Sequence, residues 1–183
     1  ITVQEKASSQ RQSQKTSHRV IFHTYRSPNL AAICKHSNEQ SRNIYCEVLL
    51  KTIAAKKKGI KNTKNGIAAL SDFWRARGLS LEGFFMKDGC GLSARNGVST
   101  KTFAQMMRKM YLDKVTFNDF YNQLAIAGRT GTLKNFCKDT KADNNIRAKS
   151  GSMNRIRSYT GYVNTQSGKL LSFSIIVNNY SCS

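Results

Sequence analysis

RAKSGSMNRIRSYTGYVNTQSGKLLSFSIIVN, which spans residues 147–178, is the stretch of the chain that decides its fold. Three segments within it, 147–152, 158–165 and 170–178, are rich in the β-branched and aromatic residues that favour strands. Short polar turns separate them, and the second turn reads QSGK. Because short turns join strands that lie side by side, these segments predict an antiparallel meander of three strands.

The residues before this meander have the apolar spacing of amphipathic helices. The segments expected to be helical are 30–34, 41–55, 67–78, 99–111 and 117–124. Two short strands are also expected in this part of the chain, at 20–25 and at 84–86, the second of them buried. Helices followed by strands are typical of an α+β fold, here an α/β sandwich in which helices flank one antiparallel sheet.

The composition is that of one strongly basic domain. Of its 183 residues, 39% are hydrophobic, which is enough for a core, while 30 Lys and Arg against 10 Asp and Glu give a net charge of +20. Such a charge favours anionic partners, whether nucleic acid, anionic lipid or an acidic envelope polymer. The one dense basic run, Lys56-Lys57-Lys58, is typical of a solvated face, and no nucleic-acid-binding motif accompanies it. We therefore expect no specific nucleic-acid partner.

The cysteines and histidines show no metal-binding pattern. The cysteines include no Cys-x-x-Cys pair and are scattered along the chain: Cys34, Cys46, Cys90, Cys137 and Cys182. Such a set indicates neither a zinc site nor a disulfide scaffold. Cys34 and Cys46 lie on neighbouring helical segments and could pair, but unpaired core thiols are the favoured interpretation. We expect no metal, no cofactor and, since no apolar stretch is long enough, no transmembrane segment.

Two short motifs about a hundred residues apart carry the chemistry. Ser41-Arg42-Asn43 begins an expected helix, and Lys149-Ser150-Gly151 lies in the first strand of the meander. Individually, Ser41 could be a helix N-cap and Lys149 an exposed strand lysine. Together, Ser-x-Asn on a helix and Lys-Ser/Thr-Gly on a strand are two of the three motifs of penicillin-recognising serine acyl-transferases. The third motif, Ser-x-x-Lys with its nucleophile, does not occur in the chain.

Further blocks occur in a fixed order along the chain: SPNL at 27–30, DGCGLS at 88–93, AGRTGTL at 127–133 and GYV at 161–163. With these blocks the chain resembles the class C low-molecular-mass penicillin-binding proteins, a family of serine-type D-alanyl-D-alanine carboxypeptidases and endopeptidases. The resemblance implies an incomplete β-lactamase/transpeptidase-like domain, with residues 18–183 as its C-terminal portion. In that family the nucleophilic serine lies far upstream and a helix follows the last strand. Both ends of this chain are therefore expected to be cut, with residues 1–17 a polar loop left by truncation.

The resemblance also assigns roles to three catalytic residues. Ser41 would relay a proton, Asn43 would bond the substrate amide, and Lys149 would supply positive potential. Acyl transfer needs such groups, because a serine attacks, a proton must reach the leaving amine and an oxyanion must be stabilised.

Three adjacent residues of the same strand would bind the substrate. The Ser150 hydroxyl would contact the terminal carboxylate, Gly151 would let another backbone approach closely, and the Ser152 N–H would be one oxyanion donor. Two positions depart from the family's usual pattern. Arg42 stands where an acidic residue is frequent, and Cys90 replaces a serine in a loop that we interpret as structural, forming one wall of the cleft.

The resemblance implies a serine-type D-alanyl-D-alanine carboxypeptidase, with or without endopeptidase activity. It would cleave peptidoglycan stem peptides ending in D-Ala-D-Ala through an acyl-enzyme, in the periplasm or elsewhere in the cell envelope, and β-lactams would inhibit the full-length enzyme. Without Ser-x-x-Lys, the 183-residue chain alone is expected to be inactive. The alternatives are a non-catalytic relic or a basic binding protein of the same fold, and an upstream Ser-x-x-Lys in the full gene would favour the enzyme.

Overall fold

The computed structural model of the chain describes residues 22–181. The loop expected at 1–17 and the first two residues of the strand expected at 20–25 lie outside this part. Residues 22–25 form no strand, so that prediction is wrong where the structure describes it. Phe22 and Tyr25 are 97% and 79% exposed, and an extended segment with no sheet beside it has no partner for its backbone groups.

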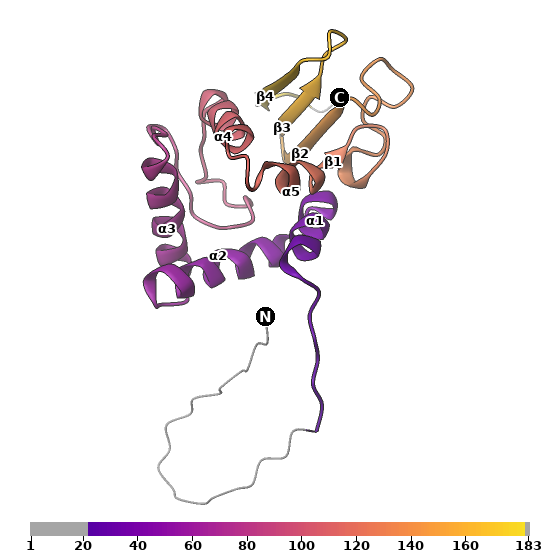
Figure 1. Cartoon of the computed structure of the whole chain (residues 1–183). Helices are drawn as coiled ribbons and strands as arrows, with labels where there is room; N and C mark the ends of the chain where they lie inside the picture. Colours follow the sequence, from indigo (N-terminus) through magenta and orange to yellow (C-terminus); the bar gives the residue numbers. More distant parts are fainter. Residues whose placement is uncertain (1–21, 182–183) are drawn as a thin grey trace, which may run out of the picture.

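Five α-helices and one sheet make up the described part of the chain (Figure 1). The helices are α1 (Leu30–Gln40), α2 (Asn43–Lys58), α3 (Thr63–Ala76), α4 (Thr100–Leu112) and α5 (Phe117–Asn122). Three of them begin at side-chain caps, because Asn29, Asn62 and Ser99 each accept a hydrogen bond from a backbone N–H of the first turn. The cap predicted at Ser99 is therefore confirmed, and each segment expected to be helical contains a helix.

The junction between α1 and α2 differs from the prediction. α2 begins at Asn43, and Ser41 is the C-cap of α1 in the left-handed conformation, with φ 53° and ψ 48°. The N–H groups of Ser41 and Arg42 both donate to the Ser37 carbonyl, which closes the end of α1. The chain therefore turns sharply at Ser41, and the Ser-x-Asn motif joins the two helices, with Ser41 ending α1 and Asn43 beginning α2.

The sheet is antiparallel throughout, in the order β1-β2-β3-β4. Its strands are β1 (Ala125–Ile126), β2 (Ile146–Met153), β3 (Ile156–Asn164) and β4 (Leu170–Asn178). The predicted meander is confirmed as β2, β3 and β4. β1 was not predicted, because a strand of 2 residues is too short to show an alternating pattern.

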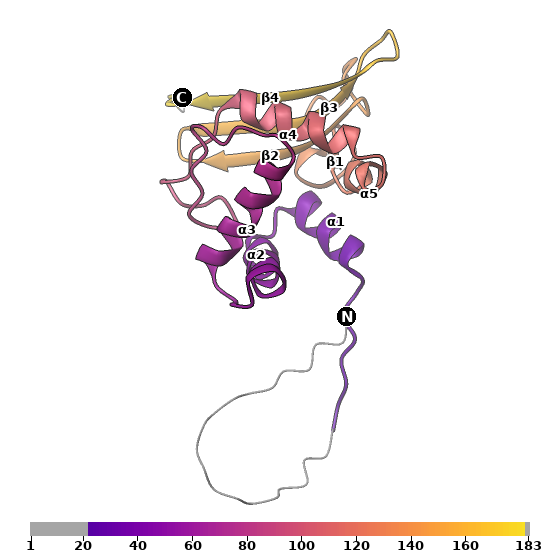
Figure 2. The same cartoon turned by 60° about the vertical axis from the view of Figure 1, so that its left-hand side comes forward.

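One face of the sheet is covered by α4 and α5 (Figure 2). Tyr162 of β3 is 1% exposed, and its hydroxyl donates to the Met107 carbonyl of α4 at 2.7 Å. Its ring also contacts the rings of Phe117 and Tyr121 in α5. Met106 of α4 is buried, as expected for a stripe that belongs to the core.

The opposite face of the sheet carries an apolar cluster. Ala125, Leu133 and Ala148 are its buried members, and Phe136 stacks on Tyr159 of β3 with 4.4 Å between the ring centroids. Helices and strands are thus arranged as an antiparallel sheet flanked by helices, and the α+β prediction is confirmed.

One further local prediction is wrong. Residues 84–86 form no buried strand, since Phe85 makes a single bridge to Gly97 and is 62% exposed. One bridge cannot bury a segment, and no further strand lies beside it in the described chain. α2 packs mainly against α3, and its first turns lie beside β2, since Ser41 just before the helix bonds Lys149 and the Cys46 thiol lies near the same ammonium.

Candidate active site

Lys149 of β2 and Ser41 of the α1–α2 turn meet, although 108 positions separate them in the chain. The Lys149 ammonium donates to the Ser41 hydroxyl at 2.8 Å and to the Ser150 carbonyl at 2.6 Å. Ser41 lies where α1 ends and α2 is about to begin, so the side chain that bonds Lys149 comes from the turn between the two helices.

The Lys149 ammonium is half-buried and has no carboxylate partner within residues 22–181. Burial lowers the pKa of Lys149 from its ordinary value of 10.5, and the nearby Cys46 thiol acts in the opposite direction. Neutral oxygens hold the ammonium in place without cancelling its charge. Such a cation can attract an anionic ligand more strongly than a solvated lysine does.

Ser150 contacts a residue that the sequence analysis did not assign to the site. Its hydroxyl donates to the Thr132 hydroxyl at 2.8 Å. Thr132 lies in a short 3₁₀-helix, Gly131–Leu133, that packs against the end of α1, where a Cβ on Gly131 would collide with the Glu39 carbonyl. The AGRTGTL block was the available signal, but it served only as a marker of family resemblance.

Asn43 is the first residue of α2, next to the turn that holds Ser41. Its side chain is exposed, and no hydrogen bond joins it to Lys149 or Ser150 in the described structure. The structure thus brings Ser41, Lys149 and Ser150 together and leaves the Asn43 amide at the margin of this cluster.

Gly151 and Ser152 continue β2 beyond the cluster. Gly151 lies opposite Ser158 of β3, and a Cβ there would collide with the Ser158 hydroxyl, a side chain rather than a backbone. Within the sheet the closest backbone approach is at Gly161, where a Cβ would collide with the carbonyl oxygen of Arg147 in β2, while the role of Gly151 in substrate binding stays a prediction. Ser152 is exposed near the end of β2.

The glycine-rich loop at 88–93 is tied to α2 near the cluster. The Glu47 carboxylate accepts hydrogen bonds from the N–H groups of Gly89 and Cys90 at 2.6 and 3.0 Å. The Asp88 carboxylate accepts from Gly91 and Ser93 within the loop, each at 2.6 Å. The loop is therefore held in place by carboxylates bonded to backbone amides, as expected of a structural element.

These same side chains form the one group in residues 22–181 with possible metal-ligand atoms close together. Atoms of Glu47, Asp88 and Cys90 lie within 4.8 Å of one another. Both carboxylates already accept backbone N–H bonds, and burial raises the pKa of the Cys90 thiol, so that it stays protonated more readily. The Glu47 and Asp88 carboxylates therefore hold the loop in its conformation through hydrogen bonds to its backbone.

The described cysteines are unpaired. Cys46 on α2 lies 3.3 Å from the Ser37 hydroxyl on α1, measured between sulfur and oxygen, and burial raises the pKa of Cys34. The interpretation of Cys34 and Cys46 as free thiols is confirmed, while Cys182 lies outside the described residues.

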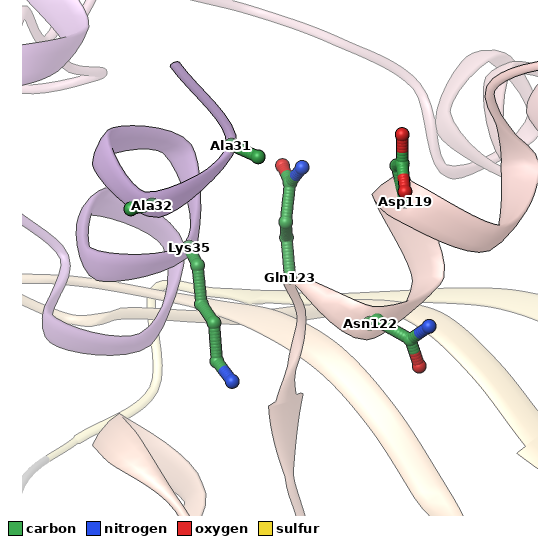
Figure 3. Close-up of a pocket in the computed structure, with 6 residues that line it drawn as sticks. All are labelled: Ala31, Ala32, Lys35, Asp119, Asn122 and Gln123. Carbon is green, nitrogen blue, oxygen red and sulfur yellow. The ribbon is translucent and has the colours of Figure 1, made fainter. Parts of the chain in front are cut away.

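A hollow of about 220 Å³ between α1 and α5 lies apart from this cluster (Figure 3). Lys35 and Asp119 line it, but their charged ends point in different directions, and none of Ser41, Lys149 and Ser150 contributes to it. A binding site needs polar groups that converge, so the chemistry of this protein is better sought at the Lys149 cluster.

A family model decides what kind of protein carries this cluster. The model of the D-Ala-D-Ala carboxypeptidase 3 (S13) family matches residues 1–183, the whole chain. The chain belongs to this family. The S13 family corresponds to the resemblance inferred from the sequence motifs, and that recognition is confirmed.

Curated relatives of this S13 chain are carboxypeptidases. It is 28% identical over 146 residues to a D-alanyl-D-alanine carboxypeptidase of an Actinomadura species, a match that covers 77% of this chain and 27% of the relative. It is 27% identical over 145 residues to a carboxypeptidase of Mycolicibacterium smegmatis, covering 76% of this chain and 32% of the relative. The chain thus spans about a third or less of the relatives it matches.

The fold is also found in a solved structure. Penicillin binding protein 4 of Haemophilus influenzae superposes with a TM-score of 0.79 at 21% identity, covering 83% of this chain and 34% of that protein. At this identity the likeness supports the fold alone. Separately, none of the helices in residues 22–181 has both the length and the hydropathy to cross a bilayer.

Proposed function

We propose that this S13 chain forms the lysine-bearing side of the active site of a serine-type D-alanyl-D-alanine carboxypeptidase. The observation that supports it best is the 2.8 Å hydrogen bond from Lys149 to Ser41 between the two motifs. The substrate would be the peptidoglycan stem peptide ending in D-Ala-D-Ala, with β-lactams as inhibitors and the cell envelope as the location. Residues 18–183 would then be part of one catalytic domain, and endopeptidase activity would act on cross-links through the same chemistry.

The reaction begins with attack by a serine hydroxyl on the peptide carbonyl carbon. The new C–O bond forms, the C–N bond to the last D-alanine breaks, and the hydroxyl proton ends on the leaving amine. Ser41 would relay that proton while Lys149 keeps the relay hydroxyl oriented and the potential positive. Water then attacks the acyl-enzyme, releases the shortened peptide and restores the serine.

Recognition of the substrate would use β2. Its terminal carboxylate is an anion, and the Ser150 hydroxyl beside the Lys149 ammonium offers a hydrogen-bond donor next to a positive charge. In the free protein this hydroxyl donates to Thr132; on carboxylate binding it would turn to the charged acceptor, and the Thr132 hydroxyl would in return donate to the Ser150 oxygen and keep it oriented. The Ser152 N–H would contribute to the oxyanion hole, and Asn43 would bond the substrate amide as the peptide enters.

The nucleophile is the part of this mechanism that the 183 residues do not supply, since they contain no Ser-x-x-Lys. We assign it to another segment of the full-length gene product. A fluorescent penicillin should label that product covalently and should not label the 183-residue chain. Lys149→Ala and Ser41→Ala should each slow labelling of the full-length product by at least about a hundredfold, because each removes one member of the relay.

The matched control is Lys169→Ala, which removes an exposed lysine from the β3–β4 turn and should leave labelling unchanged. A stable label on the 183-residue chain would identify a nucleophile within it and overturn the assignment. A full-length product that carries Ser-x-x-Lys but takes no label would instead indicate a non-catalytic relic of the fold.

A further inference from the structure

The connection between α2 and α3 is an exposed, strongly basic tip. Residues 55–62 are all exposed, and residues 48–71 contain lysines but no Asp or Glu. The lysines of this lysine tip are Lys56, Lys57, Lys58, Lys61 and Lys64. In Figure 1 the tip forms a corner of the molecule, where α2 and α3 meet away from the sheet.

Most of the charge on the lysine tip is not neutralised by the protein. Lys58 is paired with Asp72 at 2.7 Å, and Asp72 also faces Arg75. Lys56, Lys57, Lys61 and Lys64 have no carboxylate partner within the described residues. Four ammonium groups gathered at one corner attract an anionic surface.

An exposed apolar side chain lies between these lysines in the sequence. Gly59 ends α2 in the left-handed conformation, with φ 74°, and has nothing within 4 Å of the place of a Cβ. Ile60 follows it and is 60% exposed. Beside the tip, Lys64 and Lys87 flank a hollow of about 360 Å³ that Ile67 and Met86 also line. The lysine tip therefore presents one exposed isoleucine in a segment whose charged residues are all lysines.

We propose that the lysine tip docks the protein on the surface of an anionic phospholipid bilayer. The ammonium groups would lie against the lipid phosphates while Ile60 enters the acyl boundary. A soluble polyanion would satisfy the lysines but leave Ile60 in water. Residues 55–66 also contain neither an arginine nor an aromatic residue, the groups that grip nucleic acid most specifically, and lysines alone do not read bases.

Docking at this corner leaves the candidate active site free. Ser41 adjoins one end of α2 and Gly59 the other, and a helix of 16 residues separates them by about 24 Å. The bilayer would therefore hold the protein with the Lys149 cluster directed away from the lipid. Substitutions at the tip do not touch the cluster, so this proposal stands or fails independently of the proposed activity.

Sedimentation of the 183-residue chain with lipid vesicles tests the proposal. We expect binding to vesicles of phosphatidylcholine mixed with phosphatidylglycerol and none to pure phosphatidylcholine. The triple variant Lys56→Gln, Lys57→Gln, Lys61→Gln should bind about a hundredfold more weakly, from about fivefold for each lysine. Ile60→Ser should weaken binding about tenfold and Ile60→Leu should retain it.

The matched control lowers the net charge equally at a remote loop. Lys134, Lys138 and Lys141 are exposed, and changing all three to Gln should weaken binding by less than about fivefold. Equal losses in the two triple variants would show attraction by total charge alone and overturn the proposal. So would full binding by Ile60→Ser, or binding to duplex DNA with none to the anionic vesicles. Circular dichroism should show that each variant keeps the helical content of the unaltered chain.

Discussion

At the scale of single residues, Lys149 is an ammonium group held by neutral oxygens. Hydrogen bonds to the Ser41 hydroxyl and the Ser150 carbonyl replace the water that burial removes. These two hydrogen bonds do not fully make up for the lost hydration of the ammonium, since burial still lowers the pKa of Lys149. The folded chain thus carries a charge that is less stable there than in the unfolded chain, an arrangement typical of functional sites.

Lys149→Met should reveal this cost through its pH dependence. The pKa of Lys149 in the folded chain lies below 10.5, the ordinary value that it has in the unfolded chain. The charged Lys149 therefore destabilises the fold by its full amount at pH values below the folded pKa. This destabilisation disappears as the pH rises from the folded pKa to 10.5. The difference in unfolding free energy, variant minus wild type, should therefore fall as pH rises through this window. Urea unfolding at a series of pH values measures it. The same slope in the exposed-site variant Lys169→Met would contradict the prediction.

Thr132 positions the hydroxyl of Ser150 and should matter to acylation without contributing to the fold. Thr132→Val keeps the side-chain shape but removes the oxygen that Ser150 bonds at 2.8 Å. We expect the rate of penicillin labelling of the full-length product to fall about tenfold, the value of one hydrogen bond. Thr132→Ser restores the hydroxyl and should restore the rate. If Thr132→Ser is as slow as Thr132→Val, the methyl group and not the hydroxyl is what matters.

At the scale of elements, β2 and β3 pass so close together that one glycine is required between them. Gly161 of β3 lies opposite Ala148, and a Cβ there would collide with the Arg147 carbonyl oxygen and approach the Ala148 Cα at 2.6 Å. Backbone atoms on a paired strand cannot move aside as a side-chain tip can. The position of Lys149, the next residue of β2, therefore depends on a glycine in the neighbouring strand.

Gly161→Ala should destabilise the sheet by about 1–3 kcal/mol, the usual cost of overpacking a core, and more if the strands separate. Thermal unfolding measures the loss. Gly97→Ala is the matched control, because its Cβ would meet Phe85 at an ordinary 3.4 Å, and it should cost less than about 1 kcal/mol. Equal stability of the two variants would mean that β2 and β3 can separate without loss.

At the scale of the whole molecule, Tyr162 joins the sheet to the helical half. Its ring packs among the rings of α5 while its hydroxyl reaches a backbone carbonyl of α4. Burial raises the pKa of Tyr162 far above its ordinary value, so this hydroxyl stays protonated, and a donor, at neutral and mildly alkaline pH. The bond therefore fixes the distance between α4 and β3.

Tyr162→Phe should lower the free energy of unfolding by about 0.5–1.5 kcal/mol, because it removes the part-buried hydrogen bond that joins β3 to the Met107 carbonyl of α4. Tyr159→Phe is the matched control, since Tyr159 is held by ring stacking on Phe136, which the substitution keeps. Chemical denaturation of both variants measures the difference. Equal stability would mean that packing alone joins the two halves.

The sequence by itself determined the class of fold and the family. The spacing of apolar residues, alternate in strands and helical in helices, is a local property of the sequence. We could therefore predict from it the segments that form the helices and the strands β2, β3 and β4. The Ser-x-Asn and Lys-Ser-Gly motifs, in order with the blocks at 27–30, 88–93, 127–133 and 161–163, indicated the family that the S13 model then matched.

Only the tertiary structure decided how the candidate site is assembled. The left-handed turn at Ser41, the contact with Lys149 and the bond between Thr132 and Ser150 join segments far apart in the chain. No local pattern encodes such contacts, because they depend on which strand packs against which helix. The same reason explains the wrong strand at 84–86, whose apolar residues could form a strand only if the fold placed another one beside them.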